Sequence, residues 1–278
     1  MRPCIFLVLG ILGCDDPLAP ATDPPHRSEA PLPRWAGATG DIAGRVIWAG
    51  PPIAPTVVET YRPAPGARAD RVARAAPNLP IIDPASGGLA GAIVSLRGVT
   101  ATARDWDHPP ASIELHDAEP MIRQGATPPR SVGLVQRGDP VQIVSRQNIF
   151  HAVRARGAAF WTFTLPDPDR PLVRRLDQPG IVELSSAAGY YWMHAYLLVS
   201  EHPYCAVTDS MGRFALPRVP PGDYELAVWL SAWHVVRRER DPESTAVTRI
   251  VFGPHHEWRQ PVSVVANSAT DATITVPR

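Results

Sequence analysis

The stretch that decides the fold is Gly180–Val199, with the sequence GIVELSSAAGYYWMHAYLLV. Its two ends, Gly180–Leu184 and Ala195–Val199, are short aliphatic runs of the kind that form buried β-strands. The middle, Ser185–His194, has small residues followed by aromatic ones and must connect the two strands. An earlier run of the same kind contains His151. The pattern predicts a β-protein organised around this loop and a histidine from another strand.

The composition also favours strands. The chain has 278 residues, of which 45% are hydrophobic, so it can bury substantial cores. Its 20 Gly and 33 Pro are too many for a helical protein, because Pro is confined to sheet edges and loops. Candidate strands recur about every 8 to 12 positions between turn residues, as in a β-sandwich. One short helix is expected, over Ala67–Ala76.

The charged residues exclude several functions. The formal net charge is zero, so no electrostatic argument favours a nucleic-acid partner. All 27 basic residues are Arg, which excludes Schiff-base chemistry and a phosphate-binding P-loop. Because a Ser/His/Asp nucleophile signature, HExxH and CxxC are also absent, the sequence does not support an enzyme.

The first residues indicate export. Ile5–Leu12 form an apolar run that is too short to span a bilayer, and Cys14 follows it closely. This order resembles the bacterial lipobox, which implies removal of the signal peptide 1–13 and diacylation of Cys14. The alternatives are an ordinary export signal and a buried apolar segment. The lipoprotein interpretation predicts a protein anchored in the bacterial cell envelope, on its periplasmic or outer-surface side. It leaves Cys205 as the single free cysteine, so no intrachain disulfide is expected.

Residues 14–39 are rich in Pro, Ala and charge and have no periodicity, which predicts a disordered tether. Farther on, Thr208–Leu216 contains an Asp-x-x-Gly turn, in which Gly212 needs a positive φ. A Pro-Pro-Gly turn and alternating apolar residues follow it. This pattern resembles the carboxypeptidase regulatory-like (transthyretin-like) β-sandwich. The resemblance implies a sandwich split between residues 40–100 and 203–278.

A second resemblance lies next to the organising loop. The runs WMHAYLLV at 192–199 and HPYCAVTD at 202–209 are similar to plastocyanin-like cupredoxins, in particular to exported bacterial proteins of the methylamine-utilisation type. The resemblance implies an all-β fold in which a cupredoxin-like Greek-key β-sandwich, residues 101–202, is inserted in the carboxypeptidase regulatory-like sandwich.

In that family the loop supplies ligands to copper, which is bound by two His, one Cys and a weak axial Met. When the loop is aligned on Met193, the Cys position holds Ala187 and the second His position holds Tyr190. His151 and Met193 match the other two ligands. The resemblance therefore implies a degenerate copper site, with His151 and Met193 as vestigial or altered metal ligands.

The remaining loop residues have alternative interpretations. Tyr190, Tyr191 and Trp192 form either an exposed contact loop or a plug in the space left by copper. His194 is a binding-loop candidate, with a solvated strand residue as the expected alternative. Cys205 is expected to be a small buried hydrophobic residue. Two polar clusters are expected to be solvated, namely Asp105, Asp107 and His108, and His255, His256 and Glu257. For the second cluster the alternative is a weak metal site.

The sequence thus predicts a non-catalytic envelope lipoprotein that acts as a binding or structural module and needs no cofactor. Its expected partners are the membrane, through the lipid on Cys14, and another envelope protein, but not nucleic acid. The alternative is a copper-binding or electron-transfer cupredoxin with an altered, non-blue metal site.

Overall fold

The computed structural model describes residues 31–62, 70–117, 119–243, 245 and 247–276. These residues form strands, turns and loops without a helix, which confirms the all-β prediction. Residues from Leu32 onward belong to one compact unit. The predicted signal peptide, Cys14 and most of the predicted tether lie outside the described residues. Within the described part of the chain, no helix is long and apolar enough to cross a membrane.

The last residues of the predicted tether are attached to the fold. The backbone N–H of Thr102 donates to the carbonyl of Pro33 at 2.9 Å, and that of Trp35 donates to the carbonyl of Thr102 at 2.8 Å. These bonds form a parallel bridge between residues 34 and 102. The chain that leads into the first strand is therefore held in place by its backbone hydrogen bonds to Thr102.

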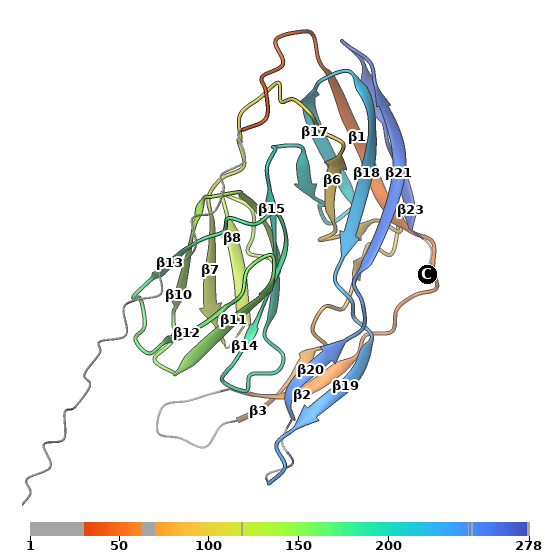
Figure 1. The fold of residues 1–278 in the computed structure, drawn as a ribbon. Helices are drawn as coiled ribbons and strands as arrows, with labels where there is room; N and C mark the ends of the chain where they lie inside the picture. Colours follow the sequence, from red (N-terminus) through yellow and green to blue (C-terminus); the bar gives the residue numbers. More distant parts are fainter. Residues whose placement is uncertain (1–30, 63–69, 118, 244, 246, 277–278) are drawn as a thin grey trace, which may run out of the picture. The chain divides into compact units, whose positions relative to one another are not determined.

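The first sandwich consists of two sheets around a shared core (Figure 1). In one sheet, β1 pairs with β17 antiparallel and with β22 and β23 parallel. In the other, β6 lies between β16 and β18, and β18 pairs with β21. The strands are β1 (Gly40–Trp48), β6 (Ile93–Arg97), β16 (Cys205–Val207), β17 (Arg213–Val219), β18 (Gly222–Leu230), β21 (His256–Val264), β22 (Ala269–Asp271) and β23 (Ile274–Val276).

The second sandwich uses a continuous part of the chain. One sheet has the order β13-β10-β7-β8 and the other the order β12-β11-β14-β15-β9. Their inner faces share a core of mainly aliphatic residues that includes Trp192 and Met193. The strands are β7 (Ala111–His116), β8 (Glu119–Gln124), β9 (Val132–Gln136), β10 (Pro140–Ser145), β11 (His151–Gly157), β12 (Trp161–Leu165), β13 (Leu172–Arg175), β14 (Gly180–Ser186) and β15 (His194–Ser200).

A third buried cluster joins the two sandwiches. It contains side chains of β6, β16 and β18 from the first sandwich and of β9 and β15 from the second. Its members are Ile93, Val132, Leu134, Tyr196, Cys205 and Trp229. One sheet of each sandwich therefore has apolar residues on both faces, so these strands have near-continuous apolar sequences instead of alternating ones.

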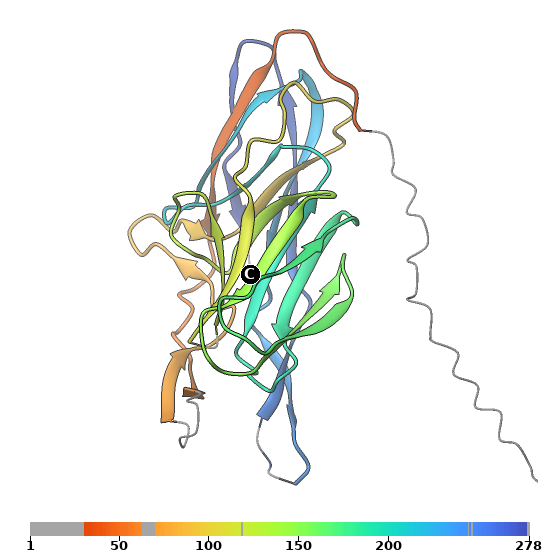
Figure 2. The same cartoon turned by 90° about the vertical axis from the view of Figure 1, so that its left-hand side faces the viewer.

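Three hairpins accompany the sandwiches (Figure 2). They are β2 (Val57–Arg62) with β3 (Asp70–Ala75), β4 (Ile81–Ile82) with β5 (Leu89–Ala90), and β19 (Val235–Arg240) with β20 (Val247–Phe252). The helix expected over Ala67–Ala76 is wrong for residues 70–75, and residues 67–69 lie outside the described part. The Ala and Arg content of that run favours a helix locally, but pairing with β2 decides its conformation.

The Asp-x-x-Gly turn has the predicted geometry. Gly212 has a φ of 76°, and the carboxylate of Asp209 accepts hydrogen bonds from the backbone N–H groups of Met211 and Arg213, both at 2.9 Å. A Cβ atom on Gly212 would lie 2.4 Å from the carbonyl oxygen of Val46. The turn therefore needs glycine both for its backbone conformation and for its close approach to β1.

Candidate functional site

The loop between β14 and β15 is anchored by one serine and one neighbouring strand. The Oγ of Ser186 accepts hydrogen bonds from the backbone N–H groups of Ala188 at 3.0 Å and Tyr190 at 3.3 Å. The backbone N–H of Ala187 donates to the carbonyl of Ala152 at 2.7 Å. Because Ala152 follows His151 on β11, this bond brings the loop to the histidine that the sequence singled out.

His151 is a buried histidine without a polar partner. Its side chain is 0% exposed, and neither ring nitrogen has a hydrogen-bond partner among the described residues. Burial lowers the pKa of His151 from 6.5 to about 4, so its imidazole is neutral at pH 7. A buried polar group without a partner costs free energy and is uncommon in folded proteins.

The aromatic residues of the loop pack on one another and on His151. The Tyr190 ring meets the His151 ring edge-on, with centroids 5.4 Å apart, and its hydroxyl donates to the carbonyl of Phe150 at 3.1 Å. The Trp192 ring lies 5.6 Å from that of Tyr190 and 5.1 Å from that of Tyr191. Trp192 is buried, whereas the two tyrosines are half-buried. The loop therefore fills space beside His151 with aromatic rings.

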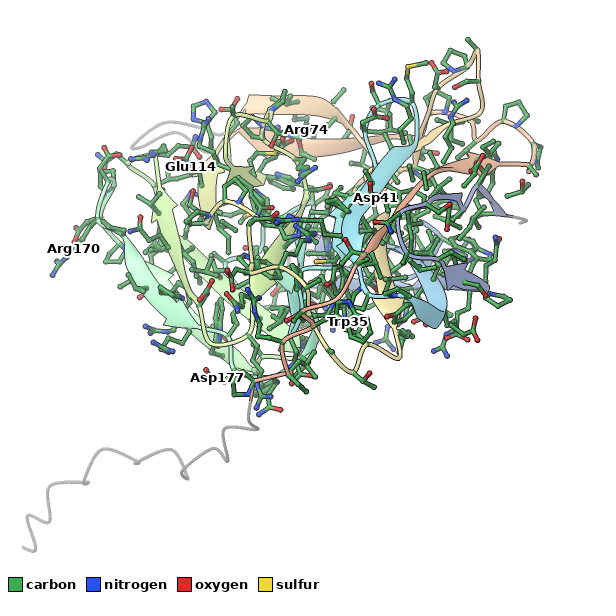
Figure 3. The ribbon with its side chains drawn as sticks, turned by 90° about the horizontal axis from the view of Figure 1, so that it is seen from above. Trp35, Asp41, Arg74, Glu114, Arg170 and Asp177 are labelled. Atoms are coloured by element: carbon green, nitrogen blue, oxygen red, sulfur yellow. The ribbon has the colours of Figure 1, made fainter. Side chains whose placement is uncertain are left out.

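The hairpin β2–β3 also contacts this loop, which the sequence did not predict. Arg74 lies on β3 (Figure 3). Its guanidinium carbon is 6.0 Å from the centre of the Trp192 ring. The hydroxyl of Tyr191 donates to the carbonyl of Glu59 on β2. Arg74 is held by the Oγ1 of Thr60 at 3.0 Å and by the carbonyl of Asp117 at 2.9 Å. The hairpin thus fixes two of the loop aromatics from outside the second sandwich.

The residues that the cupredoxin resemblance aligns with copper ligands, and the nearby Cys205, do not form a type 1 copper site. Ala187 has no donor atom, Met193 is 1% exposed within the apolar core, and Cys205 belongs to the buried cluster that joins the sandwiches. In the described segments, no group of three or more His, Cys, Asp or Glu residues is placed to hold a metal ion. No protein-family model and no curated protein matches the chain. The chemistry of the site therefore has to be inferred from its own side chains.

His194 is buried, so the expectation that it is solvated is wrong. Its side chain meets the ring of Phe252 edge-on, with centroids 4.9 Å apart, because hairpin β19–β20 covers this face of β15. Its Nε2 lies 3.2 Å from the carbonyl oxygen of Tyr191, and its Nδ1 lies 3.6 Å from Oε1 of Glu183. Contact with His194 is the main reason that the pKa of Glu183 is lowered. His194 therefore supports the loop and orients an acidic side chain on β14.

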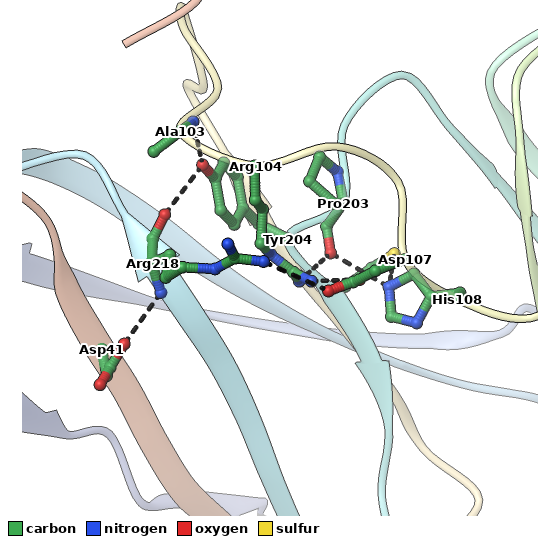
Figure 4. A network of polar contacts seen from close by, with 9 residues as sticks. Asp41, Ala103, Arg104, Asp107, His108, Pro203, Tyr204 and Arg218 are labelled. Atoms are coloured by element: carbon green, nitrogen blue, oxygen red, sulfur yellow. Dashed lines mark hydrogen bonds and ion pairs between the residues drawn. The ribbon is translucent and has the colours of Figure 1, made fainter. Parts of the chain in front are cut away.

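The cluster of Asp105, Asp107 and His108 is expected to be solvated, and the two aspartates are exposed, but His108 is half-buried. Arg104 is 4% exposed, donates to the carbonyl of Pro203 at 2.7 Å and pairs with Asp107 (Figure 4). The Nε2 of His108 lies 3.1 Å from the same carbonyl and 3.7 Å from Sγ of Cys205. Burial lowers the pKa of His108 and raises that of Cys205 to about 12. The thiol stays protonated, so this Cys–His pair is not an activated nucleophile. Asp105 is exposed, as expected, and pairs with Arg34 at 3.0 Å.

Tyr204 links the two segments that connect the sandwiches. Its hydroxyl accepts a hydrogen bond from the backbone N–H of Ala103 at 2.8 Å and donates to the carbonyl of Arg218 at 3.1 Å (Figure 4). The backbone N–H of Arg218 in turn donates to Oδ1 of Asp41 at 2.8 Å. The buried Tyr204 hydroxyl thus connects two parts of the chain. One is the segment that leads into the second sandwich, and the other is β17 of the first sandwich.

The residues 255–257 do not converge on a common point. His256 stacks on Trp233 at 4.5 Å and on Trp258 at 5.5 Å, measured between ring centroids. Glu257 pairs with Arg97 at 2.9 Å and with Arg259 at 2.7 Å, and His255 is exposed. His256 thus has a packing role, while Glu257 is part of a surface ion-pair network.

Proposed function

We propose that the protein is a non-catalytic, envelope-anchored binding module in which aromatic side chains replace the copper site of a cupredoxin-like sandwich. The observation that carries this proposal is the packing of Tyr190 against His151, with Ala187 at the thiolate position. A trigonal copper site needs a thiolate and two imidazoles in one plane. Here the His151 imidazole faces the ring of Tyr190, whose hydroxyl donates to the carbonyl of Phe150. Ala187 has no donor atom, so the thiolate and the second imidazole are both missing.

The proposal includes the finer fold relationship. The strand order and the motifs at 192–209 and 208–228 support a cupredoxin-like Greek-key sandwich inserted in a carboxypeptidase regulatory-like one. The lipobox-like sequence at Cys14 supports a lipid anchor, so the membrane and another envelope protein are the proposed partners. Replacing Cys14 by Ala tests the anchor. The variant is expected to move from the membrane fraction to the soluble fraction of the envelope.

A second candidate function is an altered metal site. It is favoured by the two ring nitrogens of His151, which have no partner in the described part of the chain, and by the neutral state of the imidazole at pH 7, in which one nitrogen has a free lone pair. A neutral imidazole is a good copper ligand, and Met193 aligns with the axial Met that the cupredoxin resemblance implies. In this case His151 and Met193, with Tyr190 or His194, would hold copper in a non-blue geometry.

Copper loading separates the two functions. Purified full-length chain is loaded with Cu(I) or Cu(II), separated from free metal, and analysed for bound copper. We expect much less than one copper per chain, and no change in His151→Ala. The double variant Ala187→Cys with Tyr190→His is the positive control, because it restores the missing donors. Stoichiometric copper in the wild type that is lost in His151→Ala would establish the altered metal site instead.

A further inference from the structure

A cavity of about 310 Å³ lies on the opposite side of β14 and β15 from the second core. Its walls come from β11, β14 and β15 of the second sandwich, from the end of β18, and from hairpin strand β20 with the residues after it. Its charged lining residues include Arg156, Glu183 and Arg249. Ligand-binding cavities in proteins range from about 300 to 1,000 Å³, so this one suits a small molecule.

The two arginines outnumber the one acidic side chain of the lining, Glu183, whose charge acts on both of them. Among the described residues, no carboxylate lies within ion-pair distance of the Arg156 guanidinium, and partial burial and then the charge of Arg249 lower its pKa. Glu183 is in contact with His194, at 3.6 Å. Glu239 lies 2.7 Å from Arg237 and 3.5 Å from Arg249, so it is shared between two cations. With two guanidinium groups and one carboxylate, the lining has a formal excess of one positive charge.

The neutral polar groups of the cavity are also donors. The indole N–H of Trp229 is buried and has no hydrogen-bond partner in the segments that the structure describes. The hydroxyl oxygen of Tyr196 accepts a hydrogen bond from the amide of Asn78 at 2.7 Å, which leaves its own hydrogen available. A bound group that supplies acceptor oxygens and a negative charge would satisfy these donors and the arginines together.

The rest of the lining is apolar. Ile181 and Phe252 are half-buried, and Trp229 is 7% exposed.

We propose that this cavity binds a small organic carboxylate, with the carboxylate on Arg156 and Arg249 and an apolar or aromatic body against Ile181, Phe252 and Trp229. This inference rests on the proposed binding role, to which it adds a site and a ligand class. The arginine fork matches a carboxylate in geometry as well as in charge.

Calorimetric titration of the purified full-length chain with benzoate tests the proposal. We expect binding with a dissociation constant at or below about 1 mM. Arg156→Gln and Arg249→Gln are each expected to weaken it by about tenfold or more. The matched control is Arg154→Gln, which removes the same charge from the same strand but does not line the cavity, and it should change the affinity by less than about twofold. Arg249→Lys, which keeps the charge but loses the fork, should fall between wild type and Arg249→Gln.

Several results would overturn the proposal. One is a wild-type protein that does not bind benzoate. Another is an equal loss of affinity in the control and in the cavity variants, each shown to be folded by circular dichroism. Binding of benzyl alcohol as tight as that of benzoate would refute the role of the charge, and tighter binding of inorganic phosphate would refute the apolar part.

Copper loading decides the proposed function separately. A protein that binds neither copper nor benzoate loses this inference alone, whereas one that binds stoichiometric copper through His151 loses the proposed function.

Discussion

The ring of Tyr190 lies edge-on against the buried imidazole of His151, with centroids 5.4 Å apart. This contact places a weakly polar ring at the position that the cupredoxin resemblance assigns to a histidine. It also separates His151 from solvent, so that its nitrogens have neither protein partners in the described segments nor exposure. The stability of the fold should therefore depend on the protonation state of His151.

The variant His151→Leu should reduce the pH dependence of stability. The pKa of His151 in the folded protein is about 4 and its ordinary value is 6.5, so between these pH values the unfolded chain binds more protons. Unfolding free energy should fall as the pH drops from 6.5 toward 4, by about 3 kcal/mol for this one group. Urea unfolding at pH 7 and pH 4.5 measures it.

The leucine variant should lose less stability than the wild type over that interval. Burial also lowers the pKa of His202 to about 4, so its contribution remains in the variant and serves as an internal reference. Equal losses in the two proteins would show that His151 titrates normally in the fold.

The thiol of Cys205 should resist alkylation in the folded protein. It is 0% exposed and burial raises its pKa to about 12, so almost no thiolate is present at pH 8. Treatment with iodoacetamide, followed by peptide mass analysis, should find Cys205 modified only after unfolding in urea. Modification under native conditions at the rate of a free thiol would contradict the packing of the cluster that joins the sandwiches.

Gly212→Ala should destabilise the protein strongly, and Gly189→Ala only mildly. Both glycines have a positive φ, which costs another residue about 1–2 kcal/mol. At Gly212 the added Cβ would also lie 2.4 Å from the carbonyl of Val46, whereas at Gly189 no atom lies within 4 Å. We expect a loss of more than about 3 kcal/mol at Gly212, measured by thermal unfolding. Similar losses at the two positions would show that β1 can move away from the turn.

Tyr204→Phe should cost about 2 kcal/mol, because it removes one hydrogen bond to Ala103 and one to Arg218 in a buried position. Tyr224→Phe is the control. It removes a single hydrogen bond, 2.9 Å long, to the carbonyl of Pro220 from a half-buried side chain. Urea unfolding should show a clearly smaller loss for the control, and equal losses would argue against a linking role for Tyr204.

Much of the fold could be predicted from local patterns. Aliphatic runs identified β14 and β15, and the Asp-x-x-Gly turn fixed the conformation of Gly212. The hairpin β2–β3 was missed because its sequence has no alternating apolar pattern and contains several Arg and Ala residues. Its conformation depends on pairing with a partner strand, which local propensity does not encode.

The candidate site was predictable only in part. The sequence identifies His151 and Tyr190 as candidate site residues. The pairing of β11 with β14 brings the loop that carries Tyr190 next to His151. The burial of His194 was not predictable, because Phe252 covers it from a hairpin far along the chain. The cavity beside Glu183 was also missed, since Arg156 and Arg249 look like solvated charges until the outer faces of two sheets are placed against each other.

The ladder partners of β1 are β17, β22 and β23, all of which lie beyond residue 212. The strands of the second sandwich, in contrast, all fall between residues 111 and 200. During synthesis from the N-terminus, the second sandwich can therefore close while β1 still has an unpaired edge. Such an edge is a template for wrong pairing. Vectorial synthesis thus imposes an order of assembly, and a nascent chain stalled near residue 200 would present β1 to chaperones or to other chains.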